Sequence, residues 1–539
     1  MSALTGIGAE VVIDGAAGYR IAAPGLTGAA RATTEPVVPG TATGQVFMRA
    51  LGNAGLSPSG TILLAHSSAA GGDVRVTVPA PAAGNNALLL VHDSTGAVSW
   101  HLPDRAAGAA QPDRQAMSFT VAANRFTHDP GGLLSRAAGL VEHFGSHFGI
   151  EPGHFGVGQG HFGIDTGHFG IGQGPAGARK VLSVLEYPVG HLAGWQLSNW
   201  FAAWERNKHP AVIRWFPPAP DHQLGEPLSP TNWGNLAQGR VLLFIHGIFS
   251  TCNGAFGAIG SDGRTWPALR QAYGGRIIGY DHPTASVGPE QNAAAFLRQI
   301  PDGLSLDVDI VTHSRGGLVA RALAAQGSAK LRIGKIVFAA TPNGGSQITM
   351  SRNWITFINR ISSVLTLPAL TLPAPVEGIT EVLAGVLELV KVLGVGTMDQ
   401  LPGLDAMRPD STFLSRLARG NGSTAEYYAA AAEFQPGPML AHLFNRLDDL
   451  AHVVDDAVFP HVRNDIAVPT NGVWDPADPA GLATPAGAPV LRGLPVPGFP
   501  VPDERRLLVG RGSTYWHCTY FQDQAMRDAL VRWLTPAAA

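Results

Sequence analysis

The chain has 539 residues, with 37 Lys and Arg against 40 Asp and Glu, and a formal net charge of −3. At roughly 100–200 residues per domain, this length predicts two or three domains. The near balance of charge and the lack of any Lys/Arg run argue against a nucleic-acid partner. Two cysteines cannot build a disulfide framework, so the composition fits a reducing compartment.

The sequence shows neither a secretion signal nor a membrane span. The N-terminal residues MSALTGIGAEVVIDG lack the basic start and the continuous apolar stretch of a secretory signal. The most apolar long segment, 355–395, is interrupted by prolines and charged residues, whereas a span needs about 18–20 uninterrupted apolar residues. We therefore expect a soluble, cytoplasmic protein in which Cys252 and Cys518 are free thiols, with a regulatory disulfide between them as the alternative.

Residues 1–130 are predicted to form a small β-sandwich. Valines alternate with polar residues over 74–78, which is the period of a half-buried strand. The apolar runs 88–91 and 97–102 flank a DSTG turn and predict a hairpin. Many short strands separated by Gly, Pro and Asn are typical of a sandwich. No catalytic pattern occurs here, so we interpret this region as a packing or interaction module.

Residues 131–177 contain a repeat. The tripeptide His-Phe-Gly occurs five times, the last four times at a period of seven. Its many glycines disfavour a helix, because each interior Gly costs about 1 kcal/mol relative to Ala. We predict a flexible linker. The alternatives are a divalent metal bound by the histidines and a protein partner recruited through residues 1–177.

From residue 178 the pattern changes to apolar strands alternating with helices. The predicted strands are 181–187, 211–216, 241–245, 276–280, 308–312, 335–340, 427–432 and 506–509. The clearest helical patterns are 196–206, 289–299 and 317–326. Continuous apolar strands joined by helices indicate an α/β fold with a buried, mostly parallel sheet.

The strongest chemical signal is the sequence VDIVTHSRGGLVAR at 308–321. An apolar strand runs into a turn that holds Ser314 and is followed by glycines and a helix, which is the context of a nucleophile elbow. Thr312 stands where the first Gly of G-x-S-x-G usually lies, and it is tolerable if its side chain points away from the neighbouring helix. The helix that follows supplies a favourable dipole for developing negative charge.

A serine that attacks an acyl carbon needs donors for the oxyanion. The strand at 241–245 ends in His-Gly, where the first donor is expected. We predict that the backbone N–H groups of Ile248 and Arg315 are the two donors. His246 is interpreted as a residue that braces this loop, and His282, in Asp-His-Pro after another strand, as a loop-stabilising residue.

The base and the acid must follow the nucleophile, because the chain order in this architecture is Ser, acid, His. After Asp465 the sequence holds a single histidine, His517, located after the apolar strand at 506–509. Imidazole can take and return a proton near neutral pH. For the acid we favour Asp465, which lies in the polar turn NDIAVP, with Asp455 and Asp456 as alternatives.

With these motifs the chain resembles an α/β-hydrolase of the bacterial lipase and esterase group, over about residues 178–539. The segments that carry the resemblance are VLLFIHG, HSRGG, IVFAATPNGGS, NDIAVP and the late histidine. The resemblance implies that Ser314 is the nucleophile, His517 the base and Asp465 the acid. It implies no metal or organic cofactor.

A long insertion at about 347–420 follows the strand after the elbow. Ile379, Leu383, Val386, Val390 and Leu393 form an apolar stripe with charged residues on other faces, so this helix must bury against something. One interpretation is a lid over an acyl-binding pocket, and the other is a cap without a gating role. We therefore expect a serine hydrolase that cleaves apolar carboxylic esters. The alternatives are an amidase, peptidase or thioesterase on the same triad, or a non-catalytic partner-binding protein on a hydrolase scaffold.

Overall fold

The fold was examined in a computed structural model of the chain. It describes residues 2–5, 10–14, 19–21, 47, 50–66, 74–93, 98–104, 116–121, 179–189, 194–216, 225–349, 355, 358–359, 362, 376–394, 401–420, 423–435, 462–478 and 491–536. The His-Phe-Gly repeats therefore lie outside the described residues, and the three interpretations of them stay predictions. Among the described residues, no helix is long and apolar enough to cross a membrane.

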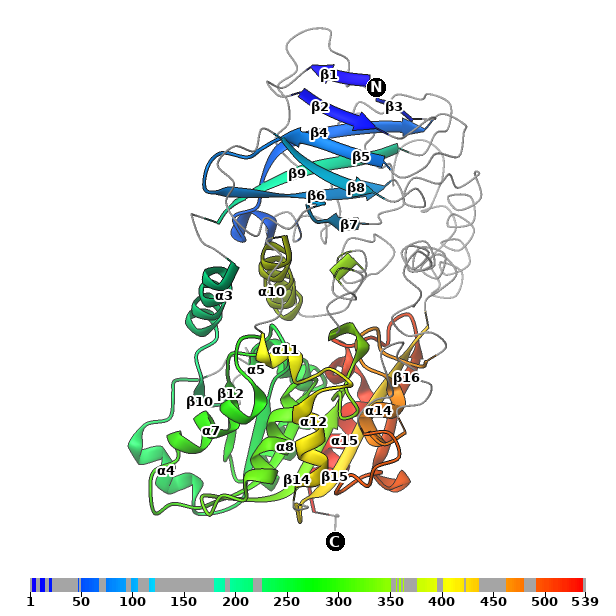
Figure 1. Cartoon of the computed structure of the whole chain (residues 1–539). Coiled ribbons are helices and arrows are strands. Elements are labelled where there is room, and N and C mark those ends of the chain that lie inside the picture. The colour runs from blue at the N-terminus through cyan, green and yellow to red at the C-terminus, as the bar shows by residue number, and fades with distance from the viewer. Residues whose placement is uncertain are drawn as a thin grey trace.

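The C-terminal part is built on a seven-stranded sheet with the order β10-β12-β11-β13-β14-β15-β16 (Figure 1). Only β10 runs antiparallel to its neighbour, and all other pairs in this sheet are parallel. The strand bounds are β10 Val212–Trp215, β11 Val241–Ile245, β12 Ile277–Asp281, β13 Leu306–His313, β14 Leu331–Ala339, β15 Glu426–Phe434 and β16 Arg506–Gly512.

Helices cover both faces of this sheet. The main helices are α3 Gly194–Lys208, α4 Pro230–Leu236, α5 Cys252–Phe256, α6 Thr265–Ala272, α7 Pro289–Gln299, α8 Gly316–Gln326, α14 Thr470–Trp474 and α15 Gln524–Leu534. Side chains of β11 alternate between two cores: Leu243 and Ile245 face one, and Leu242 and Phe244 face the other. Because both faces are buried, the strand is apolar at every position, as its sequence predicts. This is the α/β-hydrolase fold.

The N-terminal strands form two antiparallel sheets that face each other. One has the order β1-β2-β5-β8 and the other β3-β4-β9-β6-β7. Their bounds are β1 Ser2–Thr5, β2 Glu10–Asp14, β3 Tyr19–Ile21, β4 Ser57–His66, β5 Val74–Pro79, β6 Asn85–Asp93, β7 Val98–His101, β8 Ala116–Val121 and β9 Arg179–Pro188. Val76, Leu89, Phe119 and Val184 belong to the apolar core between the two sheets. The expected hairpin is present as β6 and β7.

One strand lies in a different sheet from the one expected. The sequence placed 181–187 among the strands of the parallel sheet, but β9 pairs antiparallel with β4 and β6 of the sandwich. The reason is that an apolar run fits any strand that is buried on both faces, so its composition does not choose the sheet. In β6, too, Leu88 and Leu90 face away from the sandwich core that holds Leu89 and Val91, and both sides are buried.

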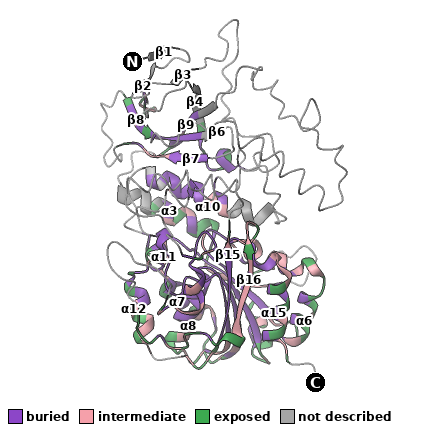
Figure 2. Ribbon diagram, turned by 90° about the vertical axis from the view of Figure 1, so that its right-hand side faces the viewer, coloured by how far each residue is buried: buried purple, intermediate pink, exposed green. Residues whose placement is uncertain are grey.

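The insertion between β14 and β15 contributes the 3₁₀-helix η4 Gln347–Thr349 and the helices α10 Val376–Gly394, α11 Pro402–Asp405 and α12 Thr412–Arg419. In Figure 2, α10 and α3 lie between the sandwich and the large sheet, and α10 is buried over most of its described length. Helix α10 contacts β6 on the sandwich and α5 on the hydrolase side. Four residues of the apolar stripe are buried as predicted, namely Leu383, Val386, Val390 and Leu393, whereas the side chain of Ile379 lies outside the described part. Glu388 and Lys391 are buried with them, 6% and 7% exposed, and their side chains form a 2.7 Å ion pair.

Candidate active site

Ser314 sits in a sharp turn between β13 and α8. Its φ is +53°, in the left-handed region that side chains rarely adopt. Such backbone strain persists only where the surrounding structure imposes it, and it is common at functional sites. The Ser314 N–H donates to the carbonyl of Ala339 at 2.8 Å, which ties the turn to the end of β14.

Two glycines after the serine make this turn possible. A Cβ on Gly316 would lie 2.2 Å from the carbonyl oxygen of Ile245, and one on Gly317 would lie 2.2 Å from Oγ1 of Thr341. Thr312, which replaces the usual first Gly, turns its hydroxyl toward β14 and donates to the Val337 carbonyl at 2.9 Å. A side chain is accommodated here because it points at a strand rather than at the helix.

The three residues predicted from the sequence lie together at the carboxyl end of the sheet. The distance between Nε2 of His517 and Oγ of Ser314 is 2.8 Å. Nδ1 of His517 lies 2.9 Å from Oδ2 of Asp465. All three side chains are buried, with residue exposures of 3%, 7% and 1% in the order Ser, His, Asp. A nucleophile, a base and an orienting acid would need a hydrogen-bond chain of this geometry.

The carboxylate of Asp465 accepts hydrogen bonds on both oxygens. Oδ1 accepts from the backbone N–H groups of Ala467 and Val468, and Oδ2 accepts from His517 and from the Tyr520 hydroxyl. Burial raises the pKa of Asp465, but the neighbouring His517 and these hydrogen bonds outweigh it, so the pKa lies below its ordinary value. The acid is therefore ionised at neutral pH. Asp455 and Asp456 lie outside the described residues.

The predicted oxyanion donors belong to residues next to Gly247 and Ser314, two residues that lie in close contact. Gly247 packs against the nucleophile so closely that a Cβ there would lie 2.6 Å from the Ser314 Cβ. In the part of the chain that the structure describes, the N–H groups of Ile248 and Arg315 donate to no other protein atom. Arg315 is also the N-cap of α8, so its N–H lies at the positive end of that helix. Both N–H groups are free to receive a developing negative charge.

A buried network holds the loop that carries Ile248. The next residue, Phe249, has a φ of +52° and donates its N–H to the Thr284 hydroxyl at 3.1 Å. That hydroxyl donates to the carboxylate of Glu205, on α3, at 2.9 Å. Glu205 is fully buried and also accepts from the backbone N–H groups of residues 284–286. A charge-assisted network of this kind fixes a loop firmly.

The other histidines near the serine have bracing contacts. His246 donates from Nδ1 to the Gly247 carbonyl and accepts the N–H of His282 on Nε2, as a loop-bracing residue should. Burial lowers the pKa of His246 to about 3 and that of His282 well below its usual value. Both rings are therefore neutral. His313 bonds through Nε2 to the carbonyl of His517 at 2.8 Å, which holds the base from behind.

Two contributors to the site were not predicted. Tyr520 donates its hydroxyl to Asp465 at 2.9 Å, and burial raises its pKa well above the ordinary value, so it remains a donor. Ser346, the last residue of TPNGGS, donates to the carbonyl of Ala467 in the acid loop. The only signals in the sequence were that Tyr520 follows His517 by three residues and that Ser346 ends the TPNGGS motif. Neither signal shows which group the side chain contacts, because that depends on the tertiary structure.

Neither thiol takes part in a disulfide. Cys252 and Cys518 are both free, the first buried and the second partly exposed, and burial raises the pKa of each. A thiol with a raised pKa is a poor nucleophile at neutral pH. Among the described residues, no cluster of three or more His, Cys, Asp and Glu side chains is arranged to hold a metal ion.

Comparison with known proteins gives one family and a set of distant folds. The family model described as "Domain of unknown function (DUF7379)" matches residues 208–535. No curated protein matches the chain. Among solved structures, mature lipase BlEst2 of Bacillus licheniformis is 14% identical, over 55% of this chain and 93% of that one, with a TM-score of 0.30. MenH from S. aureus is 12% identical, over 55% of this chain and 92% of that one, with a TM-score of 0.28. Lipase 1 from Pelosinus fermentans is 11% identical, over 56% of this chain and 100% of that one, with a TM-score of 0.30.

Proposed function

The chain belongs to the DUF7379 family, and we propose that it is a serine hydrolase that cleaves carboxylic esters. The observation that carries the proposal is the continuous chain of hydrogen bonds from Ser314 through His517 to Asp465, beside two unpaired backbone N–H groups. A nucleophile, a base, an orienting acid and an oxyanion site are the complete set of groups that acyl transfer requires.

In the first half of the reaction, Nε2 of His517 takes the proton of the Ser314 hydroxyl as Oγ attacks the ester carbonyl carbon. The carbonyl oxygen becomes an oxyanion that accepts from the N–H groups of Ile248 and Arg315. Asp465 keeps the proton of the imidazole on Nδ1, so that Nε2 is the nitrogen that accepts. His517 then gives its proton to the leaving alcohol, and an acyl-serine remains.

In the second half, water enters and loses a proton to Nε2 of His517 as its oxygen attacks the acyl carbon. The oxyanion forms again at the same two N–H groups. As it collapses, the bond to Oγ breaks and His517 returns the proton to Ser314, which releases the carboxylic acid.

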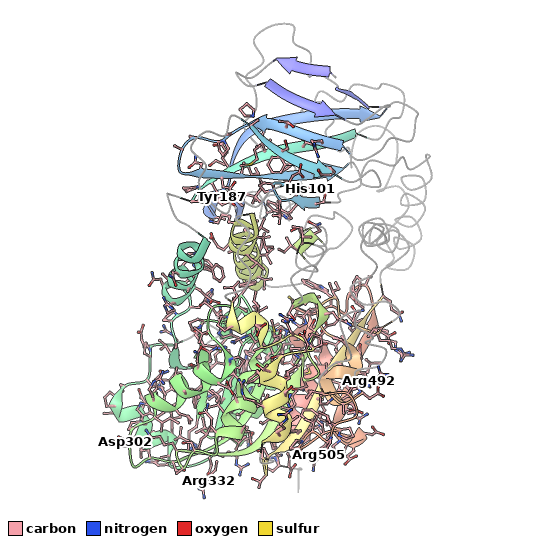
Figure 3. The ribbon with its side chains drawn as sticks, in the orientation of Figure 1. His101, Tyr187, Asp302, Arg332, Arg492 and Arg505 are labelled. Atoms are coloured by element: carbon pink, nitrogen blue, oxygen red, sulfur yellow. The ribbon has the colours of Figure 1, made fainter. Side chains whose placement is uncertain are left out.

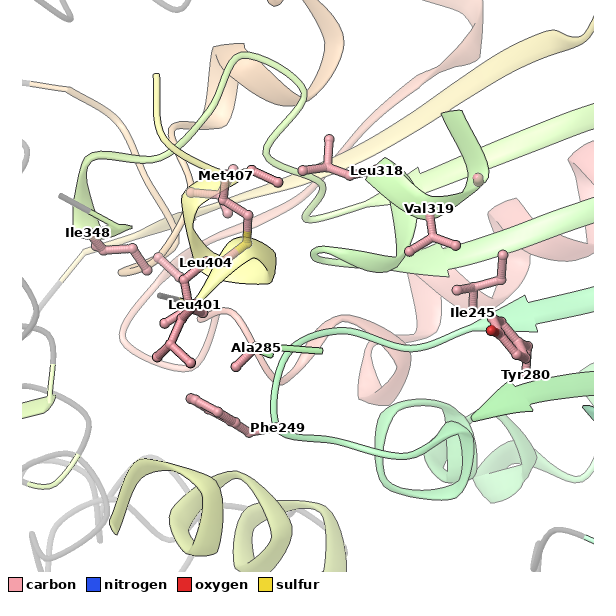
Figure 4. Close-up of a cluster of buried hydrophobic side chains, with 14 of the residues drawn as sticks. Ile245, Phe249, Tyr280, Ala285, Leu318, Val319, Ile348, Leu401, Leu404 and Met407 are labelled. Carbon is pink, nitrogen blue, oxygen red and sulfur yellow. The ribbon is translucent and has the colours of Figure 1, made fainter. Parts of the chain in front are cut away.

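The surroundings of the serine support an apolar acyl group. A cluster of buried apolar side chains lies beside the oxyanion loop and α11, including Phe249, Ile348, Leu401, Leu404 and Met407 (Figure 4). We infer from this apolar cluster next to the oxyanion loop that the acyl group is apolar, because sites for apolar ligands are lined mainly by apolar side chains. We expect kcat/KM for p-nitrophenyl esters to rise from acetate to longer chains. A constant or falling value along the series would contradict the proposed substrate class.

The decisive test is covalent labelling. A fluorophosphonate probe should label the wild-type protein and should not label Ser314→Ala. Ser261→Ala is the matched control, because Ser261 is exposed and its hydroxyl bonds only to the Ala258 carbonyl and the Arg527 guanidinium, neither of which belongs to the triad. Failure of the correctly folded wild type both to react with the probe and to cleave any ester would refute the proposal. Amide and thioester substrates, assayed in parallel, separate an esterase from the other acyl hydrolases.

The division of the chain and its location complete the proposal. We propose a sandwich region at 1–130, a repeat linker at 131–177 and a hydrolase region at 178–539, with β9 reaching back from the last region into the sandwich. The cytoplasmic location expected from the two free thiols is likewise a proposal, and fractionation of cells that express the tagged protein would test it.

A further inference from the structure

Helix α10 is buried on opposite sides. Residues three or four positions apart share one side of a helix. Leu383, Leu387 and Val390 therefore lie on one side of α10, and Gly385 and Leu389 lie on the opposite side. All of these residues are buried. A helix that buries residues on two opposite sides packs between two neighbours. Here the neighbours include β6 of the sandwich and α5, which follows the oxyanion loop.

On the sandwich side, polar bonds fix the position of the helix. Tyr187, at the end of β9, donates its hydroxyl to the carbonyl of Lys391 at 2.9 Å (Figure 3 labels Tyr187 at this junction). The ammonium of Lys391 donates to the Ala54 carbonyl at 2.7 Å and pairs with Glu388. The insertion is tied to the same sheet a second time, because Trp100 on β7 donates to Asn359 at 2.7 Å.

On the hydrolase side, the helix presses on the oxyanion loop. A Cβ on Gly385 would lie 2.4 Å from the Cβ of Phe249, so the Phe249 side chain approaches the helix backbone this closely only because residue 385 is Gly. Figure 4 shows the Phe249 ring between this helix and Leu401. Phe249 is 2% exposed, and its left-handed backbone must be held by its neighbours. Thr284 holds it from one side, and α10 packs on it from another.

We infer that the N-terminal sandwich, acting through α10, is a positioning element of the active site. It holds Phe249 in the strained conformation that aims the N–H of the preceding residue, Ile248, at the oxyanion. Gly385 and Lys391 are then positioning residues, and α10 is a fixed cover rather than a moving lid. The inference rests on the proposed serine hydrolase activity. It gives the N-terminal region a task in a reaction whose triad lies entirely in the C-terminal part.

The test uses two variants of the full chain. Gly385→Ala inserts a methyl group against Phe249, and its matched control is Ala384→Ser, a similar increase in size at a partly exposed position of the same helix. The double variant Glu388→Gln/Lys391→Met removes the buried ion pair and the bond to Ala54. Its control is Asp307→Asn/Arg332→Met, which removes a 2.6 Å exposed ion pair at the amino ends of β13 and β14.

Both test variants are expected to lower kcat for a p-nitrophenyl ester at least tenfold while KM stays within twofold. Affinity for a trifluoromethyl ketone, which forms an oxyanion on the enzyme, should fall by the same factor as kcat/KM. The controls should match the wild type. A purely structural role would lower the midpoint of thermal unfolding but would leave these ratios unchanged in the folded fraction.

The outcomes are distinguishable. Folded test variants with wild-type kcat and inhibitor affinity would overturn the inference and leave the proposed function intact. If Gly385→Ala does not fold, the Glu388→Gln/Lys391→Met variant decides by the same criterion. A wild type that neither reacts with the fluorophosphonate nor cleaves esters would overturn the proposed function, and this inference with it.

Discussion

Replacing Asp465 by Asn changes one atom of the acid and inverts the hydrogen-bonding role of that atom. In the wild type, Oδ1 accepts from the N–H groups of Ala467 at 3.0 Å and Val468 at 2.7 Å. An amide must keep its oxygen at that position, because its NH₂ group cannot accept from two N–H donors. The NH₂ group then faces Nδ1 of His517, which becomes an acceptor, and the imidazole proton moves to Nε2. His517 can no longer accept the proton of Ser314.

The magnitude follows from the cost of the flipped amide. Restoring the productive tautomer requires the NH₂ group to face two buried backbone donors, and each unsatisfied donor costs about 1–3 kcal/mol. The sum of about 2–6 kcal/mol corresponds to a loss of about 30-fold to 10⁴-fold, at 1.36 kcal/mol per factor of ten. We expect kcat of Asp465→Asn to fall within this range, with KM little changed.

The assay is steady-state hydrolysis of p-nitrophenyl butyrate, with circular dichroism to verify the fold. Asp475→Asn is a matched control, because Asp475 also accepts two backbone N–H groups on one oxygen but contacts no triad residue. Retention of kcat within threefold in a folded Asp465→Asn would refute the reasoning. The acid would then have to be sought at Asp455 or Asp456.

Three further predictions concern other parts of the fold. Tyr520→Phe removes one hydrogen-bond donor to Asp465. Because a hydrogen bond to a charged group is worth about 1.5–3 kcal/mol, kcat should fall at least tenfold. An unchanged kcat would show that Tyr520 does not support the acid. Gly316→Ala places a Cβ 2.2 Å from a backbone carbonyl, so the free energy of unfolding in urea should fall by about 1–3 kcal/mol or more, and a value equal to wild type would contradict the elbow geometry. Burial raises the pKa of Asp281 to about 6, so the folded state binds this proton more tightly than the unfolded chain, and stability falls as pH rises from about 4 to 6. The free energy of unfolding of Asp281→Asn, measured in urea, should therefore rise by about 2–3 kcal/mol relative to that of the wild type between pH 4 and pH 7. Parallel pH profiles for the two proteins would contradict this prediction.

Local pattern was sufficient to predict most of the large sheet. Strand β11 was expected at 241–245, and helix α7 at 289–299, with the bounds that the structure shows. These segments are predictable because continuous apolar strands and amphipathic helices with a Pro at the start are local signals. Strand β9 was placed in the other sheet, because pairing partners are chosen by contacts far along the chain.

The charged residues of α10 show the same limit. The sequence placed Glu388 and Lys391 on faces away from the apolar stripe, where charged groups usually meet water. In the structure they are buried against each other and against the sandwich, because a neighbouring sheet covers that side of the helix. The burial of such an ion pair depends on which neighbouring element packs against that side of the helix, and the spacing of apolar residues in the sequence does not contain this information.

The amino-acid sequence by itself determined the candidate reactive groups: a serine in a strand–turn–helix context, one late histidine, and an aspartate in a polar turn. Those are short-range patterns, and strand-ending residues of a parallel sheet necessarily gather at one edge. Only the tertiary structure decided which donors reach Asp465, why Thr312 is tolerated before the nucleophile, and how the sandwich meets the catalytic loop through α10. These contacts join residues far apart in the sequence, such as Lys391 with Ala54 (337 positions) and His517 with Ser314 (203 positions), and packing selects them.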